Sequence, residues 1–314
     1  MKPKLNRRSA ILRSVQAAML LGATGVLPRA VLANAPGTPK AVRTGVLEVP
    51  GARLYYESLG SGSPLLLIPG GNGTAHIMGP MMQVLADRFT VIAYDRRGFA
   101  RSSLVGAQDY ERRLQTDADD ALQLIARVAG TPAAVFGPSS GAIVALQAMT
   151  QAPSAISKVI AFEPPATRYM PTFAEGQQLL QLMQDTYAVY KKSGIGPALE
   201  LFNTCMPPET IEHFKRMRDP NNPQVRAAIE YWMEHELREY TSVDFDTNAL
   251  KAHATRIVIA AGTSSRGYPL HPLSENLAKR LGSTFVEIPG AHTGYAVRGA
   301  EFAQVVMKML DTGG

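Results

Sequence analysis

The stretch that decides the fold is Gly137-Pro138-Ser139-Ser140-Gly141, which lies between two apolar runs at residues 132–136 and 142–146. The first run is typical of a buried strand and the second of a helix. A serine flanked by glycines at such a junction occupies a tight, strained turn that lifts its hydroxyl off the sheet. This geometry suits a nucleophile. The pattern therefore predicts a nucleophilic Ser139, the alternative being a small-residue crossover in another type of α/β sheet.

Strand-like and helix-like runs alternate along the chain around this turn. Apart from the strand before Ser139, strands are predicted at residues 43–49, 52–58, 64–68, 89–94, 158–162, 255–261 and 284–288. Helices are predicted at residues 77–88, 116–129, 273–281 and 302–310 as well as after Ser139. This alternation predicts an α/β fold with a mostly parallel sheet covered by helices on both faces. The loops that follow the strands then meet at one edge, where sites in such sheets form.

One long segment, residues 164–250, contains no convincing strand. It offers helical stretches at 176–191, 208–218 and 223–239, divided by glycine and proline. An insertion of this length predicts a helical cap, which divides the α/β core into residues 36–163 and 251–314. We expect its methionines to be core residues or to line an adaptable apolar pocket. These are Met170, Met183, Met206, Met217 and Met233.

The N-terminus has the pattern of an export signal. Basic residues precede an apolar run at 15–27, and Ala33-Asn34-Ala35 supplies small residues for cleavage after Ala35. Residues 1–35 are therefore predicted to be a signal peptide, of either the twin-arginine type, from Arg7-Arg8, or the Sec type. The run is short for a membrane span, so an uncleaved anchor is the weaker alternative. We expect a periplasmic or secreted protein that is not membrane-bound after cleavage.

Composition excludes several classes of partner. The net charge of +6 comes from 32 basic and 26 acidic residues, but six of the basic residues and none of the acidic ones lie in residues 1–35. The mature chain is formally neutral, which gives no reason to expect a nucleic-acid partner. The single Cys205 excludes an intrachain disulfide, and the six scattered histidines show no metal-ligand spacing. We expect neither a metal nor another cofactor, and no oligomeric state follows from the sequence.

Four segments in order resemble the α/β-hydrolase superfamily, specifically its serine-nucleophile type with a helical cap. They are residues 67–73, residues 94–102, the serine turn and residues 289–295. The resemblance covers nearly all of the mature sequence. Two positions depart from the usual pattern: the first loop begins Pro69-Gly70 where His-Gly is usual, and Ala100 stands where glycine is common. Neither change removes a backbone donor.

The resemblance implies a base for the serine. His292 lies in the loop directly after the predicted strand at 284–288, where this fold brings an imidazole over the serine turn. Ser140 is the rival nucleophile, but only Ser139 lies centrally between the two glycines. His76 begins a helix beside the 67–73 loop and could contact substrate. The remaining histidines are expected to be surface or packing residues.

The acid is where this chain departs from most relatives, which carry an aspartate after the strand corresponding to 255–261. Here the loop at 262–267 has no carboxylate. Some α/β-hydrolases, including certain haloalkane dehalogenases, take the acid from the end of the strand next to the serine, where this chain has Glu163. Neighbouring strand ends lie about 5 Å apart, so Glu163 could reach His292 Nδ1. The alternatives are that Glu163 only anchors the cap, or that Asp244 or Asp246 is the acid.

Backbone donors complete the predicted site. The resemblance implies an oxyanion hole formed by the N–H groups of Ser140 and Gly71, with Asn72 as a further side-chain donor. Asp95 and Arg97 are interpreted as a structural pair that braces the turn after the strand at 89–94.

The predicted function is an exported serine hydrolase that cleaves a small-molecule carboxylic ester or lactone through an acyl-enzyme. The apolar, methionine-containing cap indicates a largely apolar substrate. A serine nucleophile disfavours haloalkane dehalogenation, which needs a carboxylate. The alternatives are a binding protein with weak or no turnover, which the missing aspartate favours, or a cofactor-free perhydrolase or haloperoxidase. Carbon–carbon bond hydrolases and acyltransferases share the fold as well.

Overall fold

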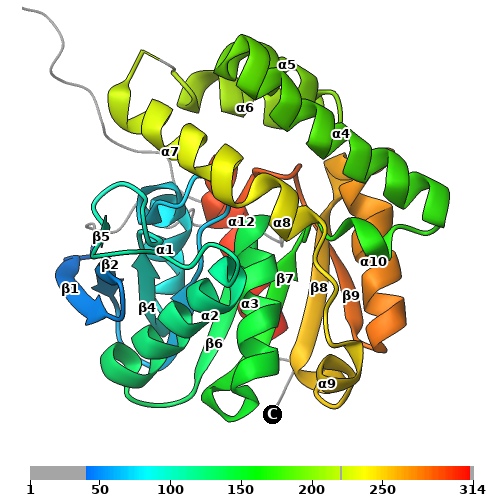
Figure 1. The fold of residues 1–314 in the computed structure, drawn as a ribbon. Helices are drawn as coiled ribbons and strands as arrows, with labels where there is room; N and C mark the ends of the chain where they lie inside the picture. Colours follow the sequence, from blue (N-terminus) through cyan, green and yellow to red (C-terminus); the bar gives the residue numbers. More distant parts are fainter. Residues whose placement is uncertain (1–39, 220, 312–314) are drawn as a thin grey trace, which may run out of the picture. The chain divides into compact units, whose positions relative to one another are not determined.

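The computed structural model describes residues 40–219 and 221–311; the predicted signal peptide lies outside them. These residues form a nine-stranded sheet in the order β1-β2-β4-β3-β6-β7-β8-β9, with β5 paired to β2 (Figure 1). The strands are β1 (Arg43–Val49), β2 (Ala52–Leu59), β3 (Ser63–Leu67), β4 (Phe89–Tyr94), β5 (Ser103–Leu104), β6 (Ala133–Pro138), β7 (Ile156–Phe162), β8 (Ile257–Gly262) and β9 (Thr284–Ile288). All pairs from β4 to β9 are parallel, whereas β1 and β2 form an antiparallel edge. The predicted fold class is confirmed.

Apolar side chains alternate between the two faces of the sheet. On β3, Leu65 and Leu67 join one buried cluster, whereas Leu66 joins the other. Helices α1 (Gly79–Leu85) and α12 (Gly299–Asp311) pack into the first cluster. Helices α2 (Arg113–Leu124), α3 (Ser140–Gln151) and α10 (Leu270–Leu281) pack into the second. Because helices cover both faces of the sheet, the sequences of the central strands are continuous apolar runs.

Residues 164–219 and 221–250 contain helices and, within that described part, no strand. The helices are α4 (Phe173–Ser193), α5 (Ile195–Asn203), α6 (Pro208–Met217), α7 (Pro223–His235), α8 (Leu237–Thr241) and α9 (Thr247–Lys251). Figure 1 shows α4 to α7 lying across one end of the sheet, and we call α4 to α8 the helical segment. Helix α5 was not predicted; Gly194, with φ of 85°, separates it from α4.

The described residues include neither a membrane-spanning helix nor a metal-binding cluster. No helix among them is long and apolar enough to cross a membrane. No group of three or more histidine, cysteine, aspartate or glutamate side chains within residues 40–219 and 221–311 is arranged to hold a metal ion.

Candidate active site

Ser139 lies in the tight turn between β6 and α3. Its φ of 55° and ψ of −125° place it in a conformation that non-glycine residues rarely adopt. A Cβ at Gly137 would lie 2.2 Å from the Gly141 carbonyl oxygen, and one at Gly141 would lie 2.2 Å from that of Ile68. Both flanking positions therefore require glycine. The Ser139 N–H donates to the Phe162 carbonyl at 2.9 Å, which ties the turn to the end of β7.

Glu163 and His292 meet although 129 residues separate them in the chain. Glu163 Oε2 lies 2.6 Å from His292 Nδ1. Its Oε1 accepts a hydrogen bond of 2.8 Å from the Gly262 N–H, and its own N–H donates to the Ala260 carbonyl at 2.8 Å. The carboxylate is completely buried, and φ at Glu163 is 47°. The backbone at the end of β8 thus holds the carboxylate in place.

The two weaker acid candidates lie elsewhere. Asp244 forms an exposed ion pair with Arg168 at 3.7 Å. Asp246 caps α9 by accepting a hydrogen bond of 2.9 Å from the Ala249 N–H. Neither makes a hydrogen bond or an ion pair with His292 among the described residues, whose Nδ1 is taken by Glu163. A carboxylate accepts a hydrogen bond, so the contact favours the tautomer of His292 that donates from Nδ1. In that tautomer Nε2 is the nitrogen left to accept a proton.

The predicted oxyanion loop lies against the serine turn. A Cβ built on Gly70 would lie 3.3 Å from Ser139 Cβ, and the next residues, Gly71 and Asn72, line one cavity together with Ser139 and His292. Ser140 is the first residue of α3, so its N–H has no partner within the helix. The Gly71 N–H also donates to no acceptor among the described residues. Both donors are therefore available to a bound oxygen.

Two further predicted contacts lie at the same cavity. Asn72 has its Oδ1 buried, without a hydrogen-bond partner in the described part of the chain. His76 is exposed and lies in the wall of this cavity. The cavity has a volume of about 420 Å³, and side chains of α6 and α7 contribute to its wall.

A second, smaller cavity of about 30 Å³ meets the first at Ser139. Met183, Cys205 and Met206 line it together with Trp232 and other apolar side chains. Met217 lines the larger cavity. Three of the five methionines singled out from the sequence, Met183, Met206 and Met217, therefore line these two cavities. Burial raises the pKa of the Cys205 thiol to about 12, which makes this side chain an inert part of the wall.

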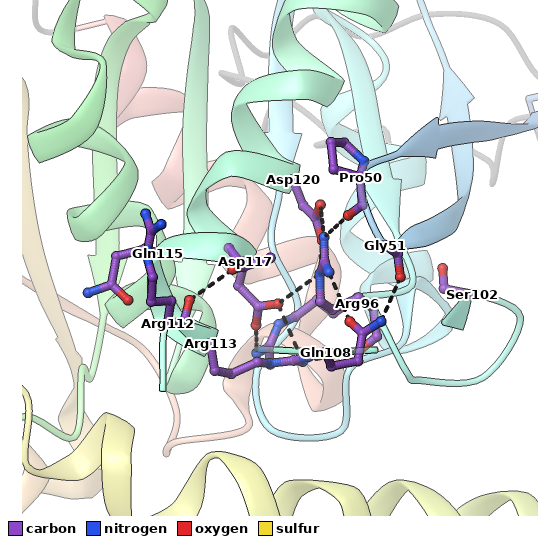
Figure 2. A network of polar contacts seen from close by, with 12 residues as sticks. Pro50, Gly51, Arg96, Ser102, Gln108, Arg112, Arg113, Gln115, Asp117 and Asp120 are labelled. Carbon is purple, nitrogen blue, oxygen red and sulfur yellow. Dashed lines mark hydrogen bonds and ion pairs between the residues drawn. The ribbon is translucent and has the colours of Figure 1, made fainter. Parts of the chain in front are cut away.

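A cluster of buried charges lies behind the oxyanion loop. Figure 2 shows part of it, with Arg96, Arg113 and Asp117 close together. Arg96 donates to the Gly70 carbonyl at 3.1 Å, to Asp117 at 2.5 Å and to Glu236 at 2.7 and 3.0 Å. Glu236 lies between α7 and α8, so a single guanidinium connects the oxyanion loop to the helical segment. Burial opposes ionisation of Asp117, but Arg113 and Arg96 lower its pKa below the ordinary value.

The predicted pair of Asp95 and Arg97 does not form. Asp95 instead binds Arg101 at 2.6 and 2.9 Å, whereas Arg97 binds Asp120 at 2.6 and 2.7 Å. The turn after β4 sends successive side chains in different directions, so proximity in sequence misled the prediction. Asp120 belongs to α2, and its partner could not be identified from spacing alone.

Glu236→Gln is expected to lower the free energy of unfolding by about 3–5 kcal/mol, because it leaves Arg96 and Arg113 with one buried carboxylate instead of two. Denaturant titration measures this loss. Glu234→Gln is the matched control: Glu234 lies two residues earlier, and its ion pair with Lys191 is partly exposed, so a loss below about 1 kcal/mol is expected. Equal losses in the two variants would contradict a stabilising role of the buried cluster.

Comparison with known proteins identifies relatives over most of the chain. Residues 63–291 match the family model described as alpha/beta hydrolase fold. The uncharacterized hydrolase YraK of Bacillus subtilis is 33% identical over 274 residues, which cover 86% of this chain and 97% of that protein. Human serine hydrolase BPHL is 34% identical over 137 residues, 43% of this chain and 46% of that protein. The enol-lactonase from Burkholderia xenovorans LB400 superposes with a TM-score of 0.62 at 15% identity, over 85% of this chain and 100% of that one.

Proposed function

The chain belongs to the alpha/beta hydrolase fold family, and we propose that it is a serine hydrolase that cleaves a carboxylic ester or lactone through an acyl-enzyme. The observation that carries the proposal is the contact of 2.6 Å between Glu163 and His292, at a cavity that His292 shares with Ser139. A buried carboxylate that holds Nδ1 leaves Nε2 free to act as a base, which is the arrangement that activates a serine.

In the proposed reaction, Ser139 Oγ attacks the substrate carbonyl carbon while His292 Nε2 takes the hydroxyl proton. Glu163 stabilises the imidazolium that forms. The N–H groups of Gly71 and Ser140 hold the negative oxygen of the tetrahedral intermediate, assisted by the N-terminus of α3. The imidazolium then protonates the leaving alkoxide. A water molecule gives its proton to His292 and attacks the acyl group, and the collapse of this second intermediate returns the proton to Ser139.

Relatives support the proposal at two levels. A protein that shares 34% identity over part of the chain is described as a serine hydrolase, and a protein of the same fold as an enol-lactonase. The apolar lining near Ser139 supports a substrate that is largely apolar around the scissile bond. We favour turnover over mere binding because Glu163 supplies the carboxylate that the loop after β8 lacks.

A fluorophosphonate probe tests the proposal. We expect the folded protein to be labelled at Ser139 with a stoichiometry of one and to hydrolyse members of a panel of p-nitrophenyl esters and lactones. Ser140→Ala is the control variant and should still be labelled, because only the backbone of Ser140 takes part. Absence of labelling and of hydrolysis in folded protein would favour the binding-protein alternative.

We also propose that the protein is exported, with residues 1–35 removed. The proposal rests on the basic, apolar and small-residue pattern at the N-terminus. The mass of the protein recovered from a bacterial host's periplasm or medium should correspond to a chain that begins at Pro36. Recovery of the full-length chain from the membrane fraction would instead favour the uncleaved anchor.

A further inference from the structure

The large cavity beside Ser139 has an unusual balance of charge. Arg101, Arg218, His76 and His213 contribute to its wall, and none of its described lining residues is an aspartate or glutamate. Arg101 is neutralised, because it binds Asp95 at 2.6 Å and Glu57 at 2.6 Å. Arg218 is therefore the one cation of this wall whose charge no described carboxylate balances within 4.0 Å.

Arg218 is held in an aromatic cage. Its Cζ lies 3.6 Å from the ring centroid of Phe214, 5.7 Å from that of Phe202 and 5.8 Å from that of Trp232. The residue as a whole is partly exposed, but Nη1 is buried and has no hydrogen-bond partner among the described residues. The other arginines that the described chain buries in its core, Arg96, Arg97 and Arg113, all bind carboxylates.

An unpaired, largely desolvated guanidinium is costly unless something satisfies it. Burial lowers the pKa of Arg218 to about 10, so the side chain still carries its charge at neutral pH. The aromatic rings offset part of the cost by cation–π attraction but accept no N–H bond in the plane of the guanidinium. Among the described residues nothing accepts a hydrogen bond from Arg218 Nη1, so this donor is open to an acceptor that enters the cavity.

Two rings of this cage also lie near the candidate nucleophile Ser139. Phe202 and Trp232 line both cavities that meet at Ser139. A Cβ on Gly71 would lie 2.6 Å from Trp232 Nε1, so the indole packs directly against the oxyanion loop. Beside Arg218, His213 has a buried Nε2 without a described partner; burial, Arg216 and Arg218 lower its pKa, so it is neutral at pH 7.

We propose that the substrate is an ester or lactone that carries a free carboxylate away from the scissile bond, and that Arg218 binds this carboxylate. The inference rests on the proposed function and deepens it by naming the substrate class. A single planar guanidinium matches the two oxygens of a carboxylate in a bidentate geometry. A phosphate, with more acceptor oxygens and a larger charge, is usually met by several donors, whereas this wall supplies only one cation without a carboxylate partner among its described lining residues.

Two pairs of matched substrates test the proposal. In the first pair the carboxylate is on the acyl side: mono-p-nitrophenyl adipate and its methyl ester. In the second it is on the alcohol side: 4-carboxyphenyl butyrate and its methyl ester. For one pair, wild-type kcat/KM should be at least about 10-fold higher for the acid than for the neutral ester. Arg218→Met should lower the value for that acid by about 10- to 100-fold and change that for the neutral ester by less than about 3-fold.

Control variants separate this effect from folding and from long-range charge. Arg216→Met removes an exposed arginine two residues earlier, on α6, that does not line the cavity, and it should leave the preference unchanged. Arg218→Met should not lower the unfolding temperature, because it replaces a guanidinium that has a buried Nη1 and no carboxylate partner with an apolar side chain of similar length. Arg218→Lys keeps a point charge without the planar fork and should retain only part of the preference. Equal losses for acid and neutral ester, or the same loss in Arg216→Met, would overturn the proposal.

Binding to Ser139→Ala distinguishes failure of this inference from failure of the proposed function. Calorimetry with the same four compounds should show one acid bound at least about 10-fold more weakly when Arg218→Met is added. If this difference appears but the wild-type protein hydrolyses nothing, the anion site stands and the proposed function fails. If hydrolysis proceeds without any dependence on Arg218, the inference fails and the proposed function stands. Tighter binding of a phosphonate analogue than of the matched acid would overturn the choice of carboxylate.

Discussion

Ser139→Ala is expected to lower kcat for the best ester of the panel by at least about 10⁴-fold. Removing the hydroxyl removes the bond-forming atom, so only the oxyanion donors and substrate binding remain to accelerate direct attack by water. Because alanine lacks only one oxygen atom, the strained turn at φ of 55° is kept, and the fold should be unchanged. Steady-state kinetics with the same ester measures the loss.

The matched control is Ser140→Ala. Ser140 is the neighbouring serine, is buried, and begins α3. Its proposed contribution is a backbone N–H, which alanine also supplies, so kcat should change by less than about 10-fold. A large loss in Ser140→Ala together with a small loss in Ser139→Ala would mean that Ser140, and not Ser139, is the nucleophile. A small loss in both variants would contradict a mechanism with a serine nucleophile.

Glu163→Gln is expected to lower kcat by about 10²- to 10⁴-fold while leaving the fold intact. The amide is nearly the same size as the carboxylate, and its oxygen can still accept the hydrogen bond from the Gly262 N–H. Its NH₂ group, however, would then face His292 Nδ1 and favour the tautomer with the proton on Nε2, which cannot take the Ser139 proton. The neutral amide also stabilises the imidazolium poorly.

The chain offers a second glutamate–histidine contact as a control for this variant. Glu287 on β9 lies 2.7 Å from His271 Nε2 and also pairs with Arg266, but neither Glu287 nor His271 lines a cavity that contains Ser139. Glu287→Gln should therefore leave kcat within about 2-fold. Turnover by Glu163→Gln close to that of the wild type would contradict its role as the acid and return it to an anchoring role.

Local pattern was enough to locate the serine turn and most strands. Strands β1, β4 and β9 begin and end where the alternation and the apolar runs predict. The two glycines around Ser139 are required by contacts within the turn and with the segment that follows β3, and the pattern could be recognised from the sequence. Glu163 was predicted because it follows a strand that the resemblance places beside the serine.

The helices were less accurately predicted. Helix α2 begins at Arg113, three residues before the predicted start, and its last turn, Ile125–Ala129, is a π-helix. Its polar side chains Arg113, Asp117 and Asp120 point inward to buried partners, so they do not follow the amphipathic rule that predicts solvent exposure. Periodicity describes how a helix meets apolar neighbours; it carries no information about buried ion pairs.

The sequence by itself determined the order of the strands and helices, the turn at Ser139 and the residue types available at the strand ends. The tertiary structure brought Glu163 to His292, which the resemblance left as one of several possibilities, and it alone showed that Arg96 meets Glu236 and that Arg218 meets rings but no described carboxylate. The physical reason is the distance along the chain over which each effect acts. Backbone preferences and apolar periodicity act over a few residues, whereas partners 129 or 140 positions apart are brought together by the packing of the whole sheet and its helical segment.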